Sequence, residues 1–342
     1  MEIVKPCTGD HIAKLTRKRT GEEKIGEFAD CVTNNWKKDL ENSTARFVIV
    51  GIPEDIGVRA NYGRGGANTA FRPALESFLN QQHNEFFNGS EVFVLGEVLV
   101  DDLMEEAAML DTRNPEQMQQ LRQLVETLDG RVSEVIRSIV ACHKIPVVIG
   151  GGHNNSFGNI KGSSLALQQK INVINCDPHL DFRPLEGRHS GNGFSYAFEQ
   201  GFLEKYSVVA MHEQYNNKAS LEKFRSEPAR LFFSSYESVF VRGEKEFSTA
   251  LKQGIGFVKQ QTCGVEIDLD AITNVPSSAK TSSGISPVQA RQYIHQCATQ
   301  LDTIYLHIAE GAPVLSHIKA DNKTGKLIAY LLTDFIKGVL SK

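Results

Sequence analysis

The chain has 342 residues, 41% of them hydrophobic and 23% charged, and a formal net charge of -4. This composition is ordinary for a globular protein with a sizeable core, and no basic stripe favours nucleic acid as a partner. No apolar run has the length of a membrane span and the first residues contain no signal-peptide core, so we expect no membrane partner. Six scattered cysteines without a C-x-x-C pair are typical of reduced thiols, which predicts a cytoplasmic protein.

The predicted elements alternate between buried strands and helices. Strands are expected at 46–51, 92–100, 145–149, 171–174, 207–212, 230–234, 263–269 and 303–309, and helices at about 115–143, 194–204, 218–226, 286–300 and 325–340. Such alternation predicts an α/β fold of three layers, αβα, around a mostly parallel sheet of about eight strands. We expect one domain over residues 45–342, preceded by an N-terminal extension, residues 1–44, without assigned chemistry.

A glycine-rich loop, residues 57–66, follows the first predicted strand and carries Arg59 and Arg64. It is long for an ordinary strand-to-helix connection, although that remains the alternative interpretation. Its glycine spacing matches no phosphate-binding loop. Either arginine is therefore a candidate contact for an anionic ligand.

Three glycines, Gly150, Gly151 and Gly152, come directly after the strand 145–149 and lead into His153. A lone histidine is more often a structural hydrogen-bonding residue than a ligand. A glycine turn at a strand end, however, presents the imidazole at the carboxyl edge of the sheet. This position favours a ligand role for His153.

Asp177, His179 and Asp181 are spaced i, i+2, i+4 after the strand 171–174. In an extended segment this spacing points all three side chains to one face. Solvated acids at a strand end are the alternative for this motif alone. The three residues otherwise form half of a metal site.

Asp268 and Asp270 repeat the i, i+2 spacing at the end of the strand 263–269, and Glu310 follows the last strand. Two aspartates on one face repel each other unless a positive charge lies between them. Glu266 is in phase with them, so pairing of Glu266 with Asp268 is an alternative register.

These residues share a predicted location, since ligands of open α/β sheets bind outside the carboxyl ends of the strands. Four carboxylates and two imidazoles are a donor set for two divalent ions, and their oxygen-rich chemistry favours Mn²⁺ over Zn²⁺. The implied reaction is metal-assisted hydrolysis of a C–N bond or an ester. The six predicted ligands are His153, Asp177, His179, Asp181, Asp268 and Asp270.

The glycine turn with His153, the Asp177-x-His179-x-Asp181 motif and Asp268-x-Asp270 resemble, in this order, the signature of the ureohydrolase (arginase) family. The resemblance covers about residues 46–340 and implies an arginase-like fold, two Mn²⁺ per chain and a small substrate derived from an amino acid. It also implies a hydroxide that bridges the ions and hydrogen-bonds to Asp181, with Glu310 facing the cationic nitrogens of the substrate. Family members are often homo-oligomers.

The loop that follows departs from the arginase pattern. Arginases carry a proton-shuttling histidine two residues after the Asn of Ser-Gly-Asn, and here that position is Phe194. His189, just upstream, is the candidate replacement, and Ser190 and Asn192 are candidate substrate contacts.

Arg183 is similar to the arginine found at this position in the formimidoylglutamase branch, where arginases usually have asparagine. A guanidinium offers a bidentate partner for a substrate carboxylate, and Arg64 is a second candidate for this contact. A local salt bridge from Arg183 to Glu186 or Asp55 is the alternative. The resemblance therefore implies hydrolysis of N-formimidoyl-L-glutamate to L-glutamate and formamide. The alternatives are an arginase or other guanidino hydrolase that releases urea, and an inactive family member that acts by binding.

Overall fold

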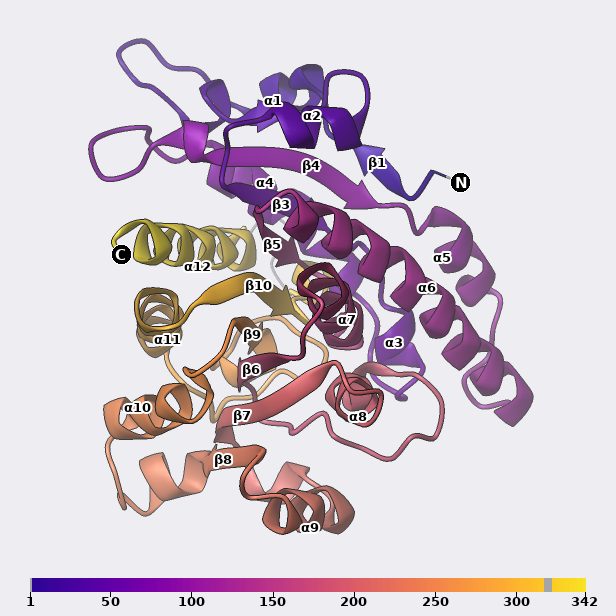
Figure 1. Cartoon of the computed structure of the whole chain (residues 1–342). Helices are drawn as coiled ribbons and strands as arrows, with labels where there is room; N and C mark the ends of the chain where they lie inside the picture. Colours follow the sequence, from indigo (N-terminus) through magenta and orange to yellow (C-terminus); the bar gives the residue numbers. More distant parts are fainter. Residues whose placement is uncertain (1, 317–321) are drawn as a thin grey trace.

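The computed structural model of the chain describes residues 2–316 and 322–342. Its centre is a ten-stranded sheet with the order β1-β4-β3-β5-β10-β9-β6-β7-β8, in which β2 also pairs with β4 (Figure 1). The strands are β1 (Val4–Pro6), β2 (Asp30–Cys31), β3 (Phe47–Gly51), β4 (Val92–Val98), β5 (Ile145–Ile149), β6 (Ile171–Cys176), β7 (Leu203–Met211), β8 (Leu231–Ser235), β9 (Cys263–Asp268) and β10 (Thr303–Ala309).

All eight predicted strands are present, and the prediction of a mostly parallel sheet is confirmed. Strand β1 runs antiparallel to β4, while the other pairings described between strands are parallel. The two strands that the sequence did not predict, β1 and β2, both come from the first 44 residues and extend the sheet at β4. This N-terminal segment therefore contributes backbone pairing to the sheet.

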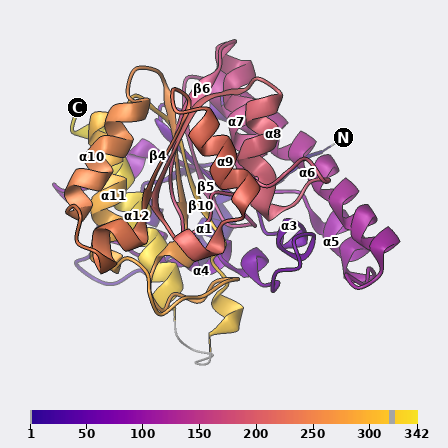
Figure 2. The ribbon, with the colours of Figure 1, turned by 90° about the horizontal axis from the view of Figure 1, so that it is seen from below.

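Helices cover both faces of the sheet, as Figure 2 shows with α10, α11 and α12 on one side of the strands and α6, α7 and α8 on the other. Helix α4 packs with α12 on the first side, and α5 packs with α6 on the second. The helices are α1 (Gly9–Leu15), α2 (Trp36–Asn42), α3 (Ile56–Arg59), α4 (Phe71–Leu79), α5 (Asp101–Ala108), α6 (Pro115–Ala141), α7 (Asn155–Leu167), α8 (Gly193–Glu199), α9 (Lys218–Ser226), α10 (Phe247–Val258), α11 (Pro287–Gln300) and α12 (Lys323–Leu340).

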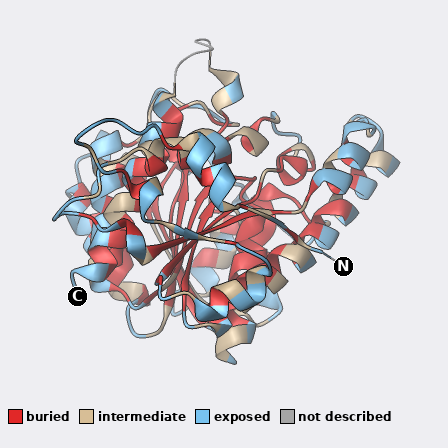
Figure 3. Cartoon of the chain, turned by 90° about the horizontal axis from the view of Figure 1, so that it is seen from above, coloured by how far each residue is buried: buried red, intermediate tan, exposed pale blue. Residues whose placement is uncertain are grey.

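Strand β3 shows how one sheet serves two cores. Phe47 and Ile49 belong to the core under α12, while Val48 and Val50 belong to the core under α6. Successive side chains of a strand point to opposite faces, and a sheet covered twice therefore needs apolar residues at every position. Figure 3 shows the result, with buried strands and helices that are exposed on their outer sides.

Local signals fix several helix ends. Asn114 caps α6 by accepting hydrogen bonds from the backbone of Glu116 and Gln117, and proline at the first helical position suits this start. Helix α8 ends at Glu199, earlier than predicted, because Gly201 adopts a left-handed backbone with φ 80° and β7 already begins at Leu203. Among the described residues, no helix combines the length and apolar character that a bilayer crossing requires.

Four strands that precede predicted site residues are neighbours in the sheet. They lie in the order β5-β10-β9-β6, and all three of their contacts are parallel. Their carboxyl ends therefore meet along one edge of the sheet, which brings together segments far apart in the sequence.

Candidate metal centre

His153 is presented by a tight turn after β5. Gly150 and Gly151 both have positive φ values, 86° and 73°, which glycine adopts without strain. A Cβ at Gly151 would lie 2.3 Å from Nδ2 of Asn155, so the turn also needs glycine for space. The buried carboxylate of Glu54 accepts hydrogen bonds from the Gly152 backbone at 2.9 Å and from Asn155 at 2.6 Å. These contacts hold the turn with the imidazole of His153 fully buried.

Three carboxylates converge on His153. Its Nδ1 lies 3.0 Å from Oδ2 of Asp177, 3.1 Å from Oδ2 of Asp181 and 3.3 Å from Oδ2 of Asp268. One N–H cannot point at three acceptors, and both ring nitrogens lack a well-formed hydrogen bond although they are buried. A donor set of one imidazole nitrogen and three carboxylate oxygens fits a cation.

A second group adjoins the first. His179, Asp268 and Asp270 offer ligand atoms that lie within 4.8 Å of one another, and Asp268 belongs to both groups. Asp177 also faces both, since its Oδ1 lies 3.4 Å from Nδ1 of His179. The structure therefore brings all six predicted ligands together, with two aspartates placed between two cation positions.

The geometry of the Asp177–Asp181 motif differs from the predicted extended segment. Strand β6 ends at Cys176, and the motif forms a turn in which the backbone N–H of His179 donates to Oδ1 of Asp177 at 2.7 Å. Asp181 adopts a left-handed backbone with φ 44°. The extended prediction was therefore wrong, and the three side chains converge because of this turn, not because of strand pleating.

The charges of the cluster shift its ionisation strongly. Burial raises the pKa of Asp268, and the nearby Asp270 and Asp177 raise it further. The pKa of Asp181 is likewise raised by burial and by Asp177. Burial alone would lower the pKa of His179, but its hydrogen bond to Asp177 raises that pKa to about 10. Without metal, a proton on the His179 imidazole thus partly neutralises the charge of the carboxylates. Bound divalent cations would supply that positive charge instead.

A cleft of about 410 Å³ opens over this cluster. Its floor includes His179, Asp181, Asp268, Asp270 and Glu310. Its walls come from α3, α9 and the segments that connect strands and helices. They are lined by Val58, Asn61, Gly63, Phe182, Arg183, Ser190, Gly191, Tyr215, Asn216, Asn217, Ser220, Ser278 and Ala279.

Glu310 lies at the carboxyl end of β10 in a left-handed conformation with φ 63°. Its Oε1 accepts the backbone N–H of His153 at 2.8 Å, and its Oε2 accepts the hydroxyl of Ser278 at 2.5 Å. Burial and the nearby Asp270 raise the pKa of Glu310 to about 8. This carboxylate is therefore held next to the metal cluster at a position where a cationic ligand group would favour its charged form.

Arg183 lies in the cleft wall, with 44% of its side chain exposed. It donates to Oδ1 of Asn61 at 3.0 Å, and its other terminal nitrogen lies 3.0 Å from Glu186. Arg183 therefore lies in the cleft wall and also forms the salt bridge to Glu186 that was the alternative interpretation of this residue. Asn61 also donates to the Ser190 hydroxyl at 3.2 Å. Asn61 and Ser278 gave no motif in the sequence, since only the folded loops place them in the cleft.

Asn192 is buried below the cleft wall. Its Oδ1 accepts a hydrogen bond from Arg188 at 2.6 Å, and Arg188 is ion-paired with Asp129 at 2.7 Å. Asn192 is not among the cleft-lining residues that the structure describes. Its contacts hold the loop that carries Ser190.

His189 and Arg64 also lie outside the described lining of the cleft. His189 is fully buried, with Nδ1 accepting the backbone N–H of Gly191 at 3.1 Å and Nε2 lying 3.2 Å from Glu186. Burial and the charge of Arg183 lower the pKa of His189 to about 4. Arg64 is exposed on the glycine-rich loop.

Phe194, which departs from the arginase pattern, and Asn154, which follows His153, both have structural partners. Phe194 stacks on Tyr206 with ring centroids 4.2 Å apart and presents an edge to His153 at 5.3 Å. Asn154 donates to Glu54 at 3.2 Å. Phe194 thus packs behind the metal cluster, and Asn154 joins the hydrogen bonds that hold the glycine turn.

The sheet and the cluster at its carboxyl edge define a class of protein. Residues 45–337 match the Arginase family, and the chain belongs to this family. The predicted family and fold are therefore confirmed.

More specific similarities point to one branch. The formimidoylglutamase of Streptococcus gordonii is 26% identical over 292 residues, which cover 83% of this chain and 81% of that protein. The solved structure of formimidoylglutamase from Bacillus subtilis aligns with a TM-score of 0.74 at 15% identity and covers 95% of both chains. The N114H variant of Trypanosoma cruzi formiminoglutamase, solved with Mn²⁺, aligns with a TM-score of 0.72 at 19% identity, covering 94% of this chain and 100% of that one.

Proposed function

We propose that this chain is a hydrolase with two Mn²⁺ ions that converts N-formimidoyl-L-glutamate and water to L-glutamate and formamide. Membership of the arginase family and the relatives named formimidoylglutamase support the proposal. The observation that carries it is that Arg183 shares one cleft with Glu310 and with ligands of the two-cation cluster. A guanidinium, a carboxylate and a metal cluster suit a substrate with a carboxylate at one end and a cationic amidine at the other.

Each ion has its own proposed set of ligands. His153, Asp177, Asp181 and Asp268 would hold one ion, and Asp177, His179, Asp268 and Asp270 the other. Ions bound there supply Lewis acidity and make hydroxide available from water near neutral pH.

Two side chains of the protein accept the proton of the attacking water and orient the amidine of the substrate. Asp181 faces His153 and also lines the cleft, so it can accept a proton from water as the oxygen adds to the formimidoyl carbon. The bond from that carbon to the glutamate nitrogen then breaks, the nitrogen takes up a proton, and formamide leaves. Glu310 orients the protonated amidine nitrogen, because its carboxylate is held at the cleft floor by Ser278 and by the backbone of His153.

Arg183 binds a carboxylate of the glutamate part, a charge-assisted contact for which a planar guanidinium is well suited. Asn61 holds the guanidinium in place, and Ser190 adds a hydroxyl on the same wall. The α-ammonium of arginine would be repelled by Arg183, which favours formimidoylglutamate over arginine. We assign Asn192 and His189 to holding the Ser190 loop without contact to the substrate.

The test is a side-by-side assay of the full-length protein. After removal of metal with a chelator and reloading with Mn²⁺, metal content is measured together with formamide and urea release from formimidoylglutamate, arginine and agmatine. Formamide release with two Mn²⁺ per chain supports the proposal. Urea release from arginine or agmatine overturns the substrate assignment, and two bound Mn²⁺ without any turnover overturns the catalytic one.

We also propose a cytosolic location. All six cysteines are free, and Cys176, Cys263 and Cys297 are buried among apolar side chains. Unpaired thiols are typical of reducing compartments. Fractionation of the cells that produce the protein tests this proposal.

A further inference from the structure

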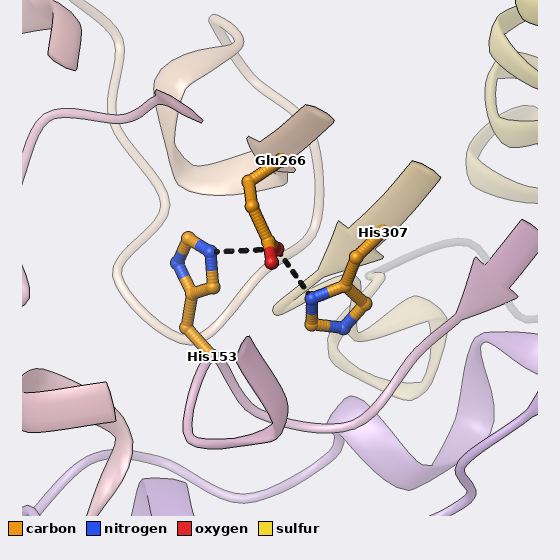
Figure 4. Close-up of side chains that lie close together, drawn as sticks. All are labelled: His153, Glu266 and His307. Atoms are coloured by element: carbon orange, nitrogen blue, oxygen red, sulfur yellow. Dashed lines mark hydrogen bonds and ion pairs between the residues drawn. The ribbon is translucent and has the colours of Figure 1, made fainter. Parts of the chain in front are cut away.

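A second group of ionisable side chains lies behind His153, on the side away from the aspartates. Glu266 on β9 and His307 on β10 are both fully buried. Oε2 of Glu266 lies 3.4 Å from Nε2 of His153 and 2.6 Å from Nδ1 of His307 (Figure 4). Neither residue is among the described residues that line the cleft, so neither is placed to contact substrate.

The carboxylate of Glu266 is held at both oxygens. Tyr305 donates its hydroxyl to Oε1 at 2.8 Å, and Nδ1 of His307 contacts Oε2. Tyr305 and His307 are neighbours on one face of β10, and both are fully buried. Glu266 therefore has a fixed position from which it faces the imidazole of His153.

The contacts also return to the turn that carries His153. Nε2 of His307 faces the carbonyl oxygen of Gly150 at 3.3 Å, and the backbone N–H of Gly150 donates to Ile308 at 2.8 Å. Gly150 is the first residue of the turn that ends at His153. Strand β10 thus contacts the start of this turn directly, and it holds Glu266, which faces the imidazole of His153.

We propose that Glu266 is a positioning residue for metal binding, which sets the tautomer and the ring orientation of His153. When Nε2 carries its hydrogen toward Glu266, the lone pair of Nδ1 faces Asp177, Asp181 and Asp268. A carboxylate behind a histidine ligand orients the ring and makes it a better donor, and its loss typically weakens metal binding by about 10- to 100-fold. This inference rests on the proposed function, since it presupposes a cation at the cluster.

The same three residues offer ligand atoms that lie within 4.8 Å of one another, so a third ion is the competing interpretation. It would require His153 to bind cations through both ring nitrogens. It would also break the 2.6 Å contact between Glu266 and His307. The geometry therefore favours a hydrogen-bonded carboxylate over a third ligand set.

The test is Mn²⁺ titration of the chelator-treated full-length protein, followed by calorimetry and by electron paramagnetic resonance of free Mn²⁺. Glu266→Gln keeps the size of the side chain but removes the negative charge that Oε2 presents to both imidazoles. We expect the dissociation constant of the Mn²⁺ ion held by His153 to rise by about 10- to 100-fold. The ion held by His179 and Asp270 should change by only a few fold. A general loss of packing would not produce this selective effect.

Two further variants keep the test decisive. His307→Gln removes one support of Glu266 and should weaken the same ion in the same direction, which decides the matter if Glu266→Gln does not fold. Glu237→Gln is the matched control: this carboxylate lies 3.7 Å from Nδ1 of His212, outside the described cleft lining, and Mn²⁺ binding should stay at the wild-type level.

Two results would overturn the inference. One is a folded Glu266→Gln protein that binds both Mn²⁺ ions with wild-type affinity, and the other is a third Mn²⁺ bound by the wild type. Failure of the proposed function gives a different result. A wild-type protein that binds two Mn²⁺ but releases no formamide would refute the catalytic proposal, and the effect of Glu266→Gln on Mn²⁺ affinity could still be measured.

Discussion

Replacing Arg183 by methionine tests the substrate assignment most directly. The side chain lies in the cleft wall, and methionine keeps much of its length while removing the charge. Hydrogen bonds to charged groups contribute about 1.5–3 kcal/mol. Because 44% of the Arg183 side chain is exposed, water screens the contact, and the lower end of that range applies. A loss of about 1.5 kcal/mol corresponds to a rise in KM of about tenfold.

Steady-state kinetics of the Mn²⁺-loaded protein on formimidoylglutamate measure this effect. We expect kcat to change less than KM and the Mn²⁺ content to remain at the wild-type level, since Arg183 belongs to neither donor set. Arg225→Met, on the exposed end of α9, is the control with the same change in charge. An unchanged KM in a folded Arg183→Met protein would refute the role of the guanidinium in binding a carboxylate.

Three further predictions concern the metal cluster and its surroundings. Asp181→Ala should abolish formamide release and weaken Mn²⁺ uptake, and full activity in this variant would contradict its assigned role. Mn²⁺ at 100 times its dissociation constant should stabilise the metal-free protein by about 2.7 kcal/mol. Differential scanning calorimetry with and without Mn²⁺ measures this, and an unchanged melting temperature argues against the cluster. The pKa of His189 in the folded protein is about 4, below the ordinary histidine value of 6.5. Between these two pH values only the unfolded chain has a protonated His189, so the free energy of unfolding decreases as the pH falls from 6.5 to 4. Metal-free wild type should thus lose on the order of 3 kcal/mol more than His189→Asn between pH 6.5 and 4 in urea titrations, and equal losses would contradict the burial argument.

The strands were predictable because a sheet covered on both faces leaves little choice of residue. β5 reads Ile-Pro-Val-Val-Ile, and every one of its five residues is buried. Strands β1 and β2 gave no comparable signal, since they span only three and two residues and depend on pairing with β4. Short strands of this kind are specified by their neighbour and not by their own periodicity.

The convergence of the six predicted ligands was predictable for a related reason, because four neighbouring strands end at one edge. The register of β9 was left open in the sequence, and the structure separates the two residues: Asp268 faces Nδ1 of His153, while Glu266 faces Nε2 on the other side of the ring. The directions of the side chains in the loops could not be predicted. Nothing in the sequence shows that the Ser190 loop turns Ser190 into the cleft and Asn192 away from it, since this depends on the buried Arg188. Side chains in loops take their direction from such distant contacts.

The left-handed backbones of Asp181 and Glu310 have a consequence for how this protein can change. Such a conformation costs a residue other than glycine on the order of 1 kcal/mol or more, and each carboxylate is also buried near others of the same sign. Selection for thermal resistance alone would therefore favour glycine at both positions, whereas the proposed reaction requires the two carboxylates. Stability and the proposed turnover are opposed at these two residues, of which Asp181 lies 3.1 Å from the imidazole of His153 and Glu310 lies 2.8 Å from its backbone nitrogen. A more robust version of this protein therefore has to gain its stability elsewhere in the chain.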